Sequence, residues 1–134
     1  MIIEATMCLA LNMYFEARKE PIAGQLAVAA VTLNRVADKR YPDDVCGVVW
    51  EKNQFSWTHD GKHDAPTRMN YLDVQAWHEI AELAEDVMSG EIELPGISST
   101  HYHATSVNPF WTKHYELDGQ VGNHLFYTNE TPYK

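Results

Sequence analysis

The sequence predicts a mainly helical α+β fold: a single domain over residues 1–134 with a small β-hairpin or loop region near its C-terminal end. Two observations indicate this fold class. Apolar residues recur at helical spacing along three stretches before Ile92, and beyond it turn residues and short alternating stretches take over. A chain of 134 residues is also long enough to bury one core without disulfide bonds.

The first helix is expected from Ile3 to about Arg18. Its buried stripe consists of Ile3, Met7, Ala10, Leu11 and Tyr14, which recur at helical spacing. The helix should end near Arg18 because Pro21 disfavours helical geometry at the residue before it, Glu20.

A second helix is expected to open at Pro21 and Gly24 and to continue through Val36. It is rich in small residues, which let neighbouring helices approach closely, so we expect a central and mostly buried position. Polar groups in such a helix need hydrogen-bond partners. The polar residues to consider in this helix are Gln25, Asn34 and Arg35. Each is either a structural group with its hydrogen bonds satisfied inside the protein or a contact to substrate.

Shorter elements follow in the middle of the chain. The turn at residues 41–44 ends in an N-cap and predicts a short helix that runs to Val49 or Trp50. Residues 52–66 are expected to be irregular, with a short strand or hairpin arm over residues 54–58.

A long helix is then expected from about Asn70 to Ser89, with an acidic outer face and Gly90 as its C′ residue. Two short strands are predicted beyond it, over residues 100–104 and 121–128. The last six residues, 129–134, are expected to fray.

One acidic residue is a candidate for catalysis. Glu16 directly follows the rings of Tyr14 and Phe15. A carboxyl group held against rings and partly out of water has its ionised form disfavoured, which raises its pKa. Such a group can stay protonated near neutral pH and donate a proton. Glu20, four residues on, is expected to raise the same pKa by like-charge repulsion. The alternative for Glu16 is a solvated glutamate in the last helical turn.

Several short motifs follow one another in a specific order. They are Tyr14-Phe15-Glu16-Ala17-Arg18-Lys19-Glu20-Pro21, Gly24-Gln25-Leu26-Ala27-Val28-Ala29-Ala30-Val31, Leu33-Asn34-Arg35-Val36, Tyr41-Pro42, Val45-Cys46-Gly47-Val48-Val49, Gln54-Phe55-Ser56-Trp57, Thr100-His101-Tyr102-His103-Ala104, Val107-Asn108-Pro109, Trp111 and Gly122-Asn123-His124-Leu125-Phe126-Tyr127. Together they resemble the SleB family of cell-wall hydrolases, which includes spore-cortex lytic enzymes and phage endolysins. The resemblance implies a lysozyme-like fold and cleavage of the peptidoglycan glycan by lytic transglycosylation, with Glu16 at the position of the catalytic acid.

One position departs from the family pattern. Lys19 stands where the family usually has glycine, in Glu-Ala-Arg-Gly-Glu. A glycine there would permit a turn with positive φ at no steric cost, so the backbone geometry at Lys19 is open. The carboxylate of Glu16 is not affected.

Sugar sites place aromatic faces against the apolar faces of the sugar rings and polar groups at the ring edges. The candidate substrate-binding residues are Gln25, Asn34, Gln54, Phe55, Ser56, Tyr102, His103, Trp111, His124 and Tyr127. For Phe55 and Trp111, a place in the core is an equal alternative. Tyr102 is the leading candidate, because a hydroxyl near the acid can orient the acid or the substrate. We expect the C-terminal segments to face the junction of the first two helices and to form a cleft there.

Glycan cleavage requires an acid that protonates the bridging oxygen while positive charge develops on the sugar ring. Most glycosidases add a second carboxylate, but no sequence context selects Glu20, Asp43, Asp44 or Asp60 for that role. A lytic transglycosylase, which the resemblance implies, needs only Glu16. That carboxylate would next take the proton of the muramic acid C6 hydroxyl as the 1,6-anhydro product forms. A hydrolytic muramidase is the nearest alternative.

The histidines suggest a rival from another class, a zinc-dependent wall amidase or peptidase. His101, His103, His114 and His124 gather in the last third of the chain. However, no His-Glu-x-x-His or Cys-x-x-Cys spacing is present. We therefore predict no metal and no other cofactor. A third alternative is a non-catalytic wall-binding module, in which Glu16 would be dispensable.

The formal net charge of −9 argues against nucleic-acid binding, which requires a basic face. The same charge opposes attraction to anionic peptidoglycan, although salt limits such fields to about 8 Å under physiological conditions. No stretch approaches the ~20 apolar residues that cross a bilayer. We expect a monomer that acts on bacterial peptidoglycan glycan strands, without stable membrane association.

The chain has two cysteines, Cys8 and Cys46, interpreted first as small buried hydrophobic side chains. A disulfide between them requires an oxidising compartment and a short distance, which the sequence does not give. The first residues, 1–4, lack the basic and apolar segments of a signal peptide. We expect synthesis in a host cytoplasm and action at the wall or periplasm after release, as for a phage endolysin.

Overall fold

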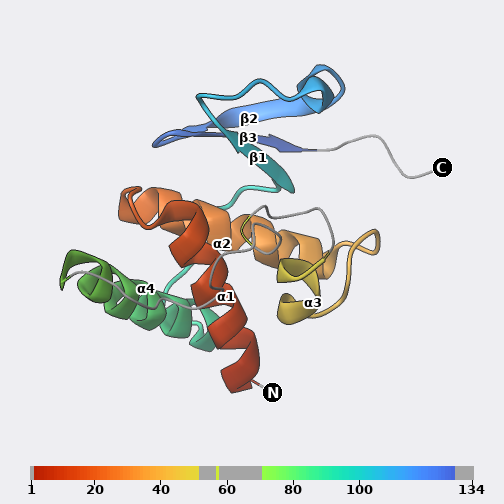
Figure 1. Cartoon of the computed structure of the whole chain (residues 1–134). Helices are drawn as coiled ribbons and strands as arrows, with labels where there is room; N and C mark the ends of the chain where they lie inside the picture. Colours follow the sequence, from red (N-terminus) through yellow and green to blue (C-terminus); the bar gives the residue numbers. More distant parts are fainter. Residues whose placement is uncertain (1, 52–56, 58–70, 129–134) are drawn as a thin grey trace.

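The computed structural model describes residues 2–51, 57 and 71–128, which form a group of helices with a small sheet over it (Figure 1). The elements in chain order are α1 (Ile2–Ala17), α2 (Ile22–Ala37), α3 (Val45–Val49), α4 (Tyr71–Ser89), β1 (His101–Ala104), the 3-10 helix η2 (Phe110–Lys113), β2 (Glu116–Val121) and β3 (His124–Thr128). The mainly helical α+β prediction is confirmed. The predicted hairpin arm over residues 54–58, apart from Trp57, and the predicted frayed end over residues 129–134 lie outside the described residues.

The bounds of the predicted helices agree with the structure to within a residue or two. The predicted buried stripe of the first helix is wrong at Met7, which is 48% exposed. α1 ends at Ala17, and α2 begins at Ile22 directly after Pro21, so the proline separates them as expected. Ala27, Ala29 and Ala30 are almost fully buried, which confirms a central position for α2. Figure 1 shows why: the sheet lies over α2, while α1, α3 and α4 lie on its other side.

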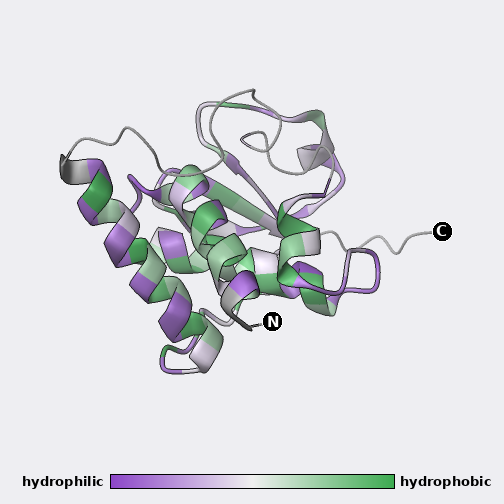
Figure 2. Cartoon of the chain, turned by 60° about the horizontal axis from the view of Figure 1, so that its bottom comes forward, coloured by the Kyte–Doolittle hydropathy of each residue, from purple (hydrophilic) through white to green (hydrophobic). Residues whose placement is uncertain are grey.

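The main core is centred on α1, which packs against α2, α3 and α4. Leu9, Met13, Val28 and Ile80 are among its most completely buried side chains, with at most 1% exposure each. Hydrophobic and hydrophilic residues alternate around α4, as expected for a helix with one buried face (Figure 2). Burial of these aliphatic groups is the main stabilisation of the helical layer.

The sheet is antiparallel with strand order β1-β3-β2. The predicted strand over residues 121–128 is wrong in its first part, because Gly122 and Asn123 form the turn between β2 and β3. β2 was not predicted. Its side chains are mostly exposed and its pairing is interrupted between Leu117 and Gly119, so no regular alternation marks it in the sequence.

The pairing of β1 with β3 decides which side chains share a face of the sheet. Tyr102 lies opposite Phe126, and Phe126 packs on α2, so this pair faces the helices. His101 and His103 alternate with Tyr102 along β1 and therefore point to the other face, together with Tyr127. The two faces carry different parts of the predicted site.

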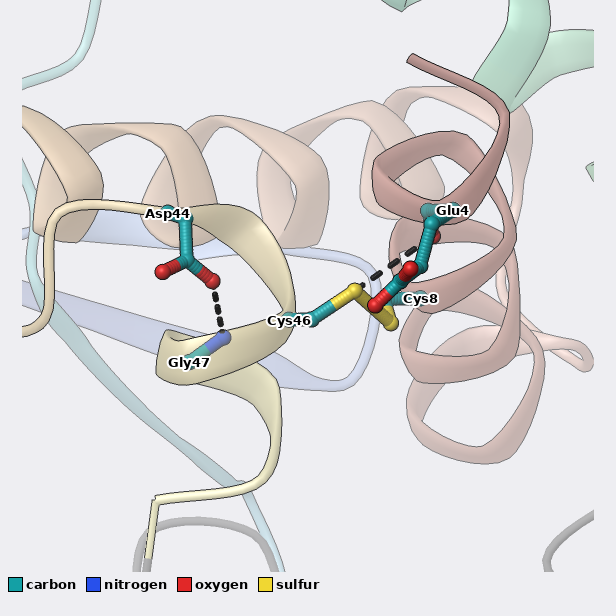
Figure 3. Close-up of a disulfide and its surroundings, with 5 residues drawn as sticks. All are labelled: Glu4, Cys8, Asp44, Cys46 and Gly47. Atoms are coloured by element: carbon teal, nitrogen blue, oxygen red, sulfur yellow. Dashed lines mark hydrogen bonds between the residues drawn. A yellow bond between two sulfur atoms is a disulfide. The ribbon is translucent and has the colours of Figure 1, made fainter. Parts of the chain in front are cut away.

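Cys8 on α1 and Cys46 on α3 form a disulfide, with an S–S distance of 2.13 Å and Cα atoms 5.3 Å apart (Figure 3). This pairing corrects the interpretation of two separate buried thiols. It depends on the packing of α3 against α1, which the sequence does not reveal. Asp44 caps α3 as predicted, because its Oδ1 accepts a hydrogen bond from the Gly47 amide at 2.6 Å.

Candidate active site

Glu16 lies in the last turn of α1, and Tyr102 lies on β1. The Tyr102 hydroxyl donates a hydrogen bond to Glu16 Oε1 at 2.6 Å, across 86 positions of sequence. The segment 101–104 therefore does face the junction of the first two helices, as the sequence leads us to expect. This contact joins the helical layer to the sheet at the candidate acid.

The pKa of Glu16 is raised above the ordinary value of a glutamate, and burial is the main cause. The hydrogen bond from Tyr102 and the charge of Arg35 act in the opposite direction without cancelling it. The expected repulsion from Glu20 is not among these causes, because Glu20 lies beyond the end of α1 and turns toward the sheet. Burial thus produces the raised pKa that the sequence led us to expect, but without Glu20.

Tyr102 is itself held as a hydrogen-bond donor. Burial and the neighbouring Glu16 carboxylate raise its pKa well above the usual value for tyrosine, so the hydroxyl keeps its proton. Its ring is fixed by edge-on contact with His124, at 5.2 Å between ring centroids, and by Phe126 at 5.5 Å. A fixed donor at Oε1 stabilises the ionised form of Glu16 once its proton has left.

Glu20 connects the junction of α1 and α2 to the turn between β2 and β3. Its Oε1 accepts a hydrogen bond from the Asn123 backbone amide at 2.7 Å, and its Oε2 accepts one from the Asn123 side chain at 3.3 Å. His124 Nδ1 lies 3.9 Å from Glu20 Oε1, and burial lowers the pKa of this imidazole. Glu20 thus holds the hairpin against the helices.

The close approach of this turn requires glycine at position 122. Gly122 has φ of +56°, and an added Cβ would collide with Glu20 Oε1. We expect Gly122→Ala to lower the free energy of unfolding by about 1–2 kcal/mol. Urea unfolding measures this. Gly96→Ala is the control, because nothing lies within 4 Å of its Cβ position, and an equal loss in both variants would contradict the close approach.

The polar residues of α2 tie it to neighbouring segments. Gln25 donates to the carbonyls of Ala17 and Glu20, at 3.3 and 3.2 Å, and so caps the end of α1. Asn34 donates to two carbonyls of the segment that leads into β1, at 2.9 Å each, and Arg35 donates to the Thr100 carbonyl at 2.8 Å. These bonds hold β1 in place. Substrate contact by Gln25 or Asn34 stays a prediction.

The remaining aromatic candidates gather on the other face of the sheet. His103 Nε2 lies 3.0 Å from the Tyr127 hydroxyl, and the two rings stack. Trp111 contacts both, with ring centroids 5.7 Å from His103 and 5.2 Å from Tyr127. These three residues therefore pack on one another on the face of the sheet opposite Tyr102. His124 lies on the same face as Tyr102. Their contact with substrate stays a prediction, and Gln54, Phe55 and Ser56 lie outside the described residues.

A hollow of about 450 Å³ lies at the junction, lined by Arg18, Glu20, Pro21, Ile22 and Gln25 and by the α4 residues Glu79, Glu82, Leu83 and Asp86. Of the predicted substrate-binding residues it contains Gln25, and Glu16 is not part of its lining. A cleft around Glu16 itself stays a prediction.

Sequence reasoning missed the polar residue beneath Glu16. Asn12 precedes Glu16 by one helical turn on α1 and is fully buried. It contacts Trp57 and Thr32. A signal was present, because Asn12 is the one polar residue in the otherwise apolar run 9–14 and lies four residues before Glu16, on the same side of a helix.

Within residues 2–51, 57 and 71–128, no group of three or more His, Cys, Asp or Glu side chains is placed to hold a metal ion. His101 instead packs against Trp111 and Tyr115, and burial lowers its pKa to about 4. In the same part of the chain, no helix combines the length and the apolar character that a membrane span requires.

A family model described as Cell Wall Hydrolase matches residues 19–127, which is most of the chain. The protein belongs to the cell wall hydrolase family. The matched region begins at Lys19 and so does not include Glu16. The resemblance that the sequence motifs indicate is thereby confirmed at the level of the family.

Curated relatives of this cell wall hydrolase are spore cortex-lytic enzymes. That of Oceanobacillus iheyensis is 31% identical over 116 residues, which cover 84% of this chain and 37% of that protein. That of Halalkalibacterium halodurans is 48% identical over 54 residues, 40% of this chain and 16% of that protein. The chain thus spans well under half the length of these relatives.

Two solved structures are similar over nearly the whole chain. The catalytic domain of the germination-specific lytic transglycosylase SleB from Bacillus anthracis has a TM-score of 0.67 and 26% sequence identity, covering 92% of this chain and 93% of that one. The catalytic domain of the SleB protein from Bacillus cereus has a TM-score of 0.63 and the same identity, covering 93% and 91%. The cell wall hydrolase has the fold of these catalytic domains.

Proposed function

We propose that this cell wall hydrolase cleaves the MurNAc–GlcNAc bond of peptidoglycan glycan strands as a lytic transglycosylase. The observation that carries the proposal is the carboxyl of Glu16, whose pKa is raised mainly by desolvation and which has a hydrogen-bond donor fixed at Oε1. The similar Bacillus anthracis domain is described as a lytic transglycosylase, which supports the same reaction here.

In the proposed reaction Glu16 acts twice. As an acid, it gives its proton to the bridging oxygen, the glycosidic bond breaks, and positive charge develops on the muramic acid ring. The Tyr102 hydroxyl stabilises the resulting carboxylate. Glu16 then takes the proton of the C6 hydroxyl, O6 bonds to C1, and the 1,6-anhydro product forms with no water consumed. The N-acetyl group of the substrate can stabilise the intermediate.

The surroundings of Glu16 support a mechanism with one carboxylate. The groups that shift its pKa in the described part of the chain are Tyr102 and Arg35, and neither is a carboxylate. Glu20 is engaged with Asn123, and Asp44 caps α3. Inverting and retaining glycosidases place their second carboxyl roughly 5–9.5 Å from the first. Asp60 lies outside the described residues.

The test is mass spectrometry of the soluble fragments released from purified peptidoglycan in water enriched in heavy oxygen, with and without EDTA. Glycan fragments with anhydro ends, no heavy oxygen and no effect of EDTA are expected. Reducing ends that carry heavy oxygen would indicate a muramidase instead. Cleavage of the stem peptides that EDTA abolishes would indicate a metal-dependent amidase or peptidase.

We further propose that the enzyme works as a monomer at the wall or periplasm, in the manner of a phage endolysin. The Cys8–Cys46 disulfide supports a site of action outside reducing cytoplasm. Sacculi of vegetative cells should then be solubilised by the purified protein, which should elute as a monomer. Activity confined to isolated spore cortex would contradict the endolysin role and favour that of the cortex-lytic relatives.

A further inference from the structure

A buried polar network lies directly beneath Glu16. Its centre is Asn12, which is fully buried between the equally buried Leu9 and Met13. Burying an amide costs free energy unless its hydrogen-bonding groups find partners. Asn12 and Glu16 are four residues apart on α1 and so lie on the same side of the helix. The partners of Asn12 therefore bear on the candidate acid.

Trp57 fixes the orientation of the Asn12 amide. The indole Nε1 donates a hydrogen bond to Asn12 Oδ1 at 2.8 Å. Because an indole nitrogen can only donate, the amide oxygen must face Trp57 and the amide nitrogen must face the other way. The Trp57 ring is held in turn, since it stacks on Phe15 at 4.9 Å and meets Trp50 edge-on at 5.0 Å.

The amide nitrogen of Asn12 has two protons to donate. One is donated to Thr32 Oγ1, 3.4 Å from the amide nitrogen, and the Thr32 hydroxyl in turn donates a hydrogen bond to the Val28 carbonyl at 3.1 Å. The other is available to the Tyr102 hydroxyl oxygen, because a side-chain hydrogen bond from Asn12 acts to lower the pKa of Tyr102, against the larger effects that raise it. Tyr102 then donates its single proton to Glu16 Oε1 at 2.6 Å. All hydrogen bonds from Trp57 to Glu16 run in one direction.

We propose that Asn12 is a positioning residue that fixes the direction of the Tyr102 hydroxyl and thereby assigns the catalytic proton to Oε2 of Glu16. While Asn12 donates to it, the Tyr102 hydroxyl directs its proton at Oε1, which must accept. A protonated Glu16 then carries its proton on Oε2, the oxygen left for the bridging oxygen of the substrate. This inference rests on the proposed role of Glu16 as the acid.

The same direction of bonding matters after proton transfer. The bond from Tyr102 to the Glu16 carboxylate becomes charge-assisted and hence stronger. Among the described residues, Arg35 on α2 also favours the Glu16 carboxylate, through its charge.

Three variants separate the network from general packing. Asn12→Leu keeps the volume but removes the donor to Tyr102. Trp57→Phe keeps an aromatic ring against Phe15 but removes the N–H that orients the amide. Thr32→Val is the matched control, because Thr32 is fully buried and bonded to Asn12 but lies outside the path from Trp57 to Glu16. If Asn12→Leu does not fold, the comparison of Trp57→Phe with Thr32→Val tests the proposal in its place.

The measurement is a carbon-13 NMR titration of the Glu16 carboxyl in the folded protein, assigned by its absence in Glu16→Gln. We expect its pKa to rise by about one unit or more in Asn12→Leu, because the Tyr102 hydroxyl is then no longer held in place as a donor to the ionised form. A smaller rise is expected in Trp57→Phe and none in Thr32→Val. The alkaline limb of the pH–rate profile should move by the same amounts.

An unchanged pKa of Glu16 in both Asn12→Leu and Trp57→Phe would overturn the proposal, as would an equal shift in Thr32→Val. The titration needs no substrate, so the two proposals can fail separately. If the shifts occur but the wild type releases no peptidoglycan fragments, the network stands and the proposed function falls.

Discussion

Glu16→Gln is expected to lose at least about a hundredfold of the rate of peptidoglycan cleavage, because the amide cannot donate the proton that the bridging oxygen needs. The shape of the side chain and the hydrogen bond from Tyr102 are retained. The rate of release of soluble fragments measures the loss. Glu85→Gln is the control, since Glu85 is an exposed glutamate on α4. Equal rates in the two variants would contradict the role of Glu16.

The same variant should not be less stable than the wild type. The folded-state pKa of Glu16 is raised, so ionisation opposes folding as the pH rises from the ordinary pKa of glutamate through the folded-state pKa. Glutamine has no such cost. Urea unfolding should therefore show similar stability at low pH and higher stability of Glu16→Gln at neutral pH. Lower stability of the variant at neutral pH would indicate a structural carboxylate instead.

The second large effect concerns stability. Removal of the Cys8–Cys46 disulfide, by reduction or by the double substitution Cys8→Ser and Cys46→Ser, is expected to lower the free energy of unfolding by about 4 kcal/mol. The physical reason is that the bond closes a loop across 38 positions of sequence and so restricts the unfolded chain. Denaturant unfolding with and without a reducing agent measures the loss.

The double variant is its own control, because the reducing agent should not change its stability. If reduction leaves the unfolding midpoint of the wild type unchanged, the disulfide does not contribute as the chain-entropy argument requires. The activity of reduced protein that is still folded should be retained, because the bond connects α1 to α3 about two helical turns from Glu16.

Local patterns were enough to predict the helices. Helical periodicity marks α1, α2 and α4, and Pro21 marks the break between the first two. β2 could not be found in the same way, because an exposed strand interrupted near Gly119 has no alternating pattern. The disulfide could not be predicted from the sequence either, since it depends on how α3 packs against α1.

The candidate acid could be predicted from the sequence, but the shape of its surroundings could not. Alternation along β1 does imply that Tyr102 and His103 point to opposite faces of the sheet, so at most one of them can contact Glu16. Which face meets the helices depends on the pairing with β3 and on Phe126 packing against α2. The role of Asn12 depends on Trp57, which is 45 positions away in sequence.

The measurement that tests the central claim most directly is the titration of the Glu16 carboxyl in the folded wild-type protein. The claim is that burial keeps this group protonated at a pH where an exposed glutamate is ionised. The predicted result is a pKa above the ordinary value for glutamate, about 4.3. A pKa at or below that value would contradict the claim, because no proton would then be held ready for the bridging oxygen near neutral pH.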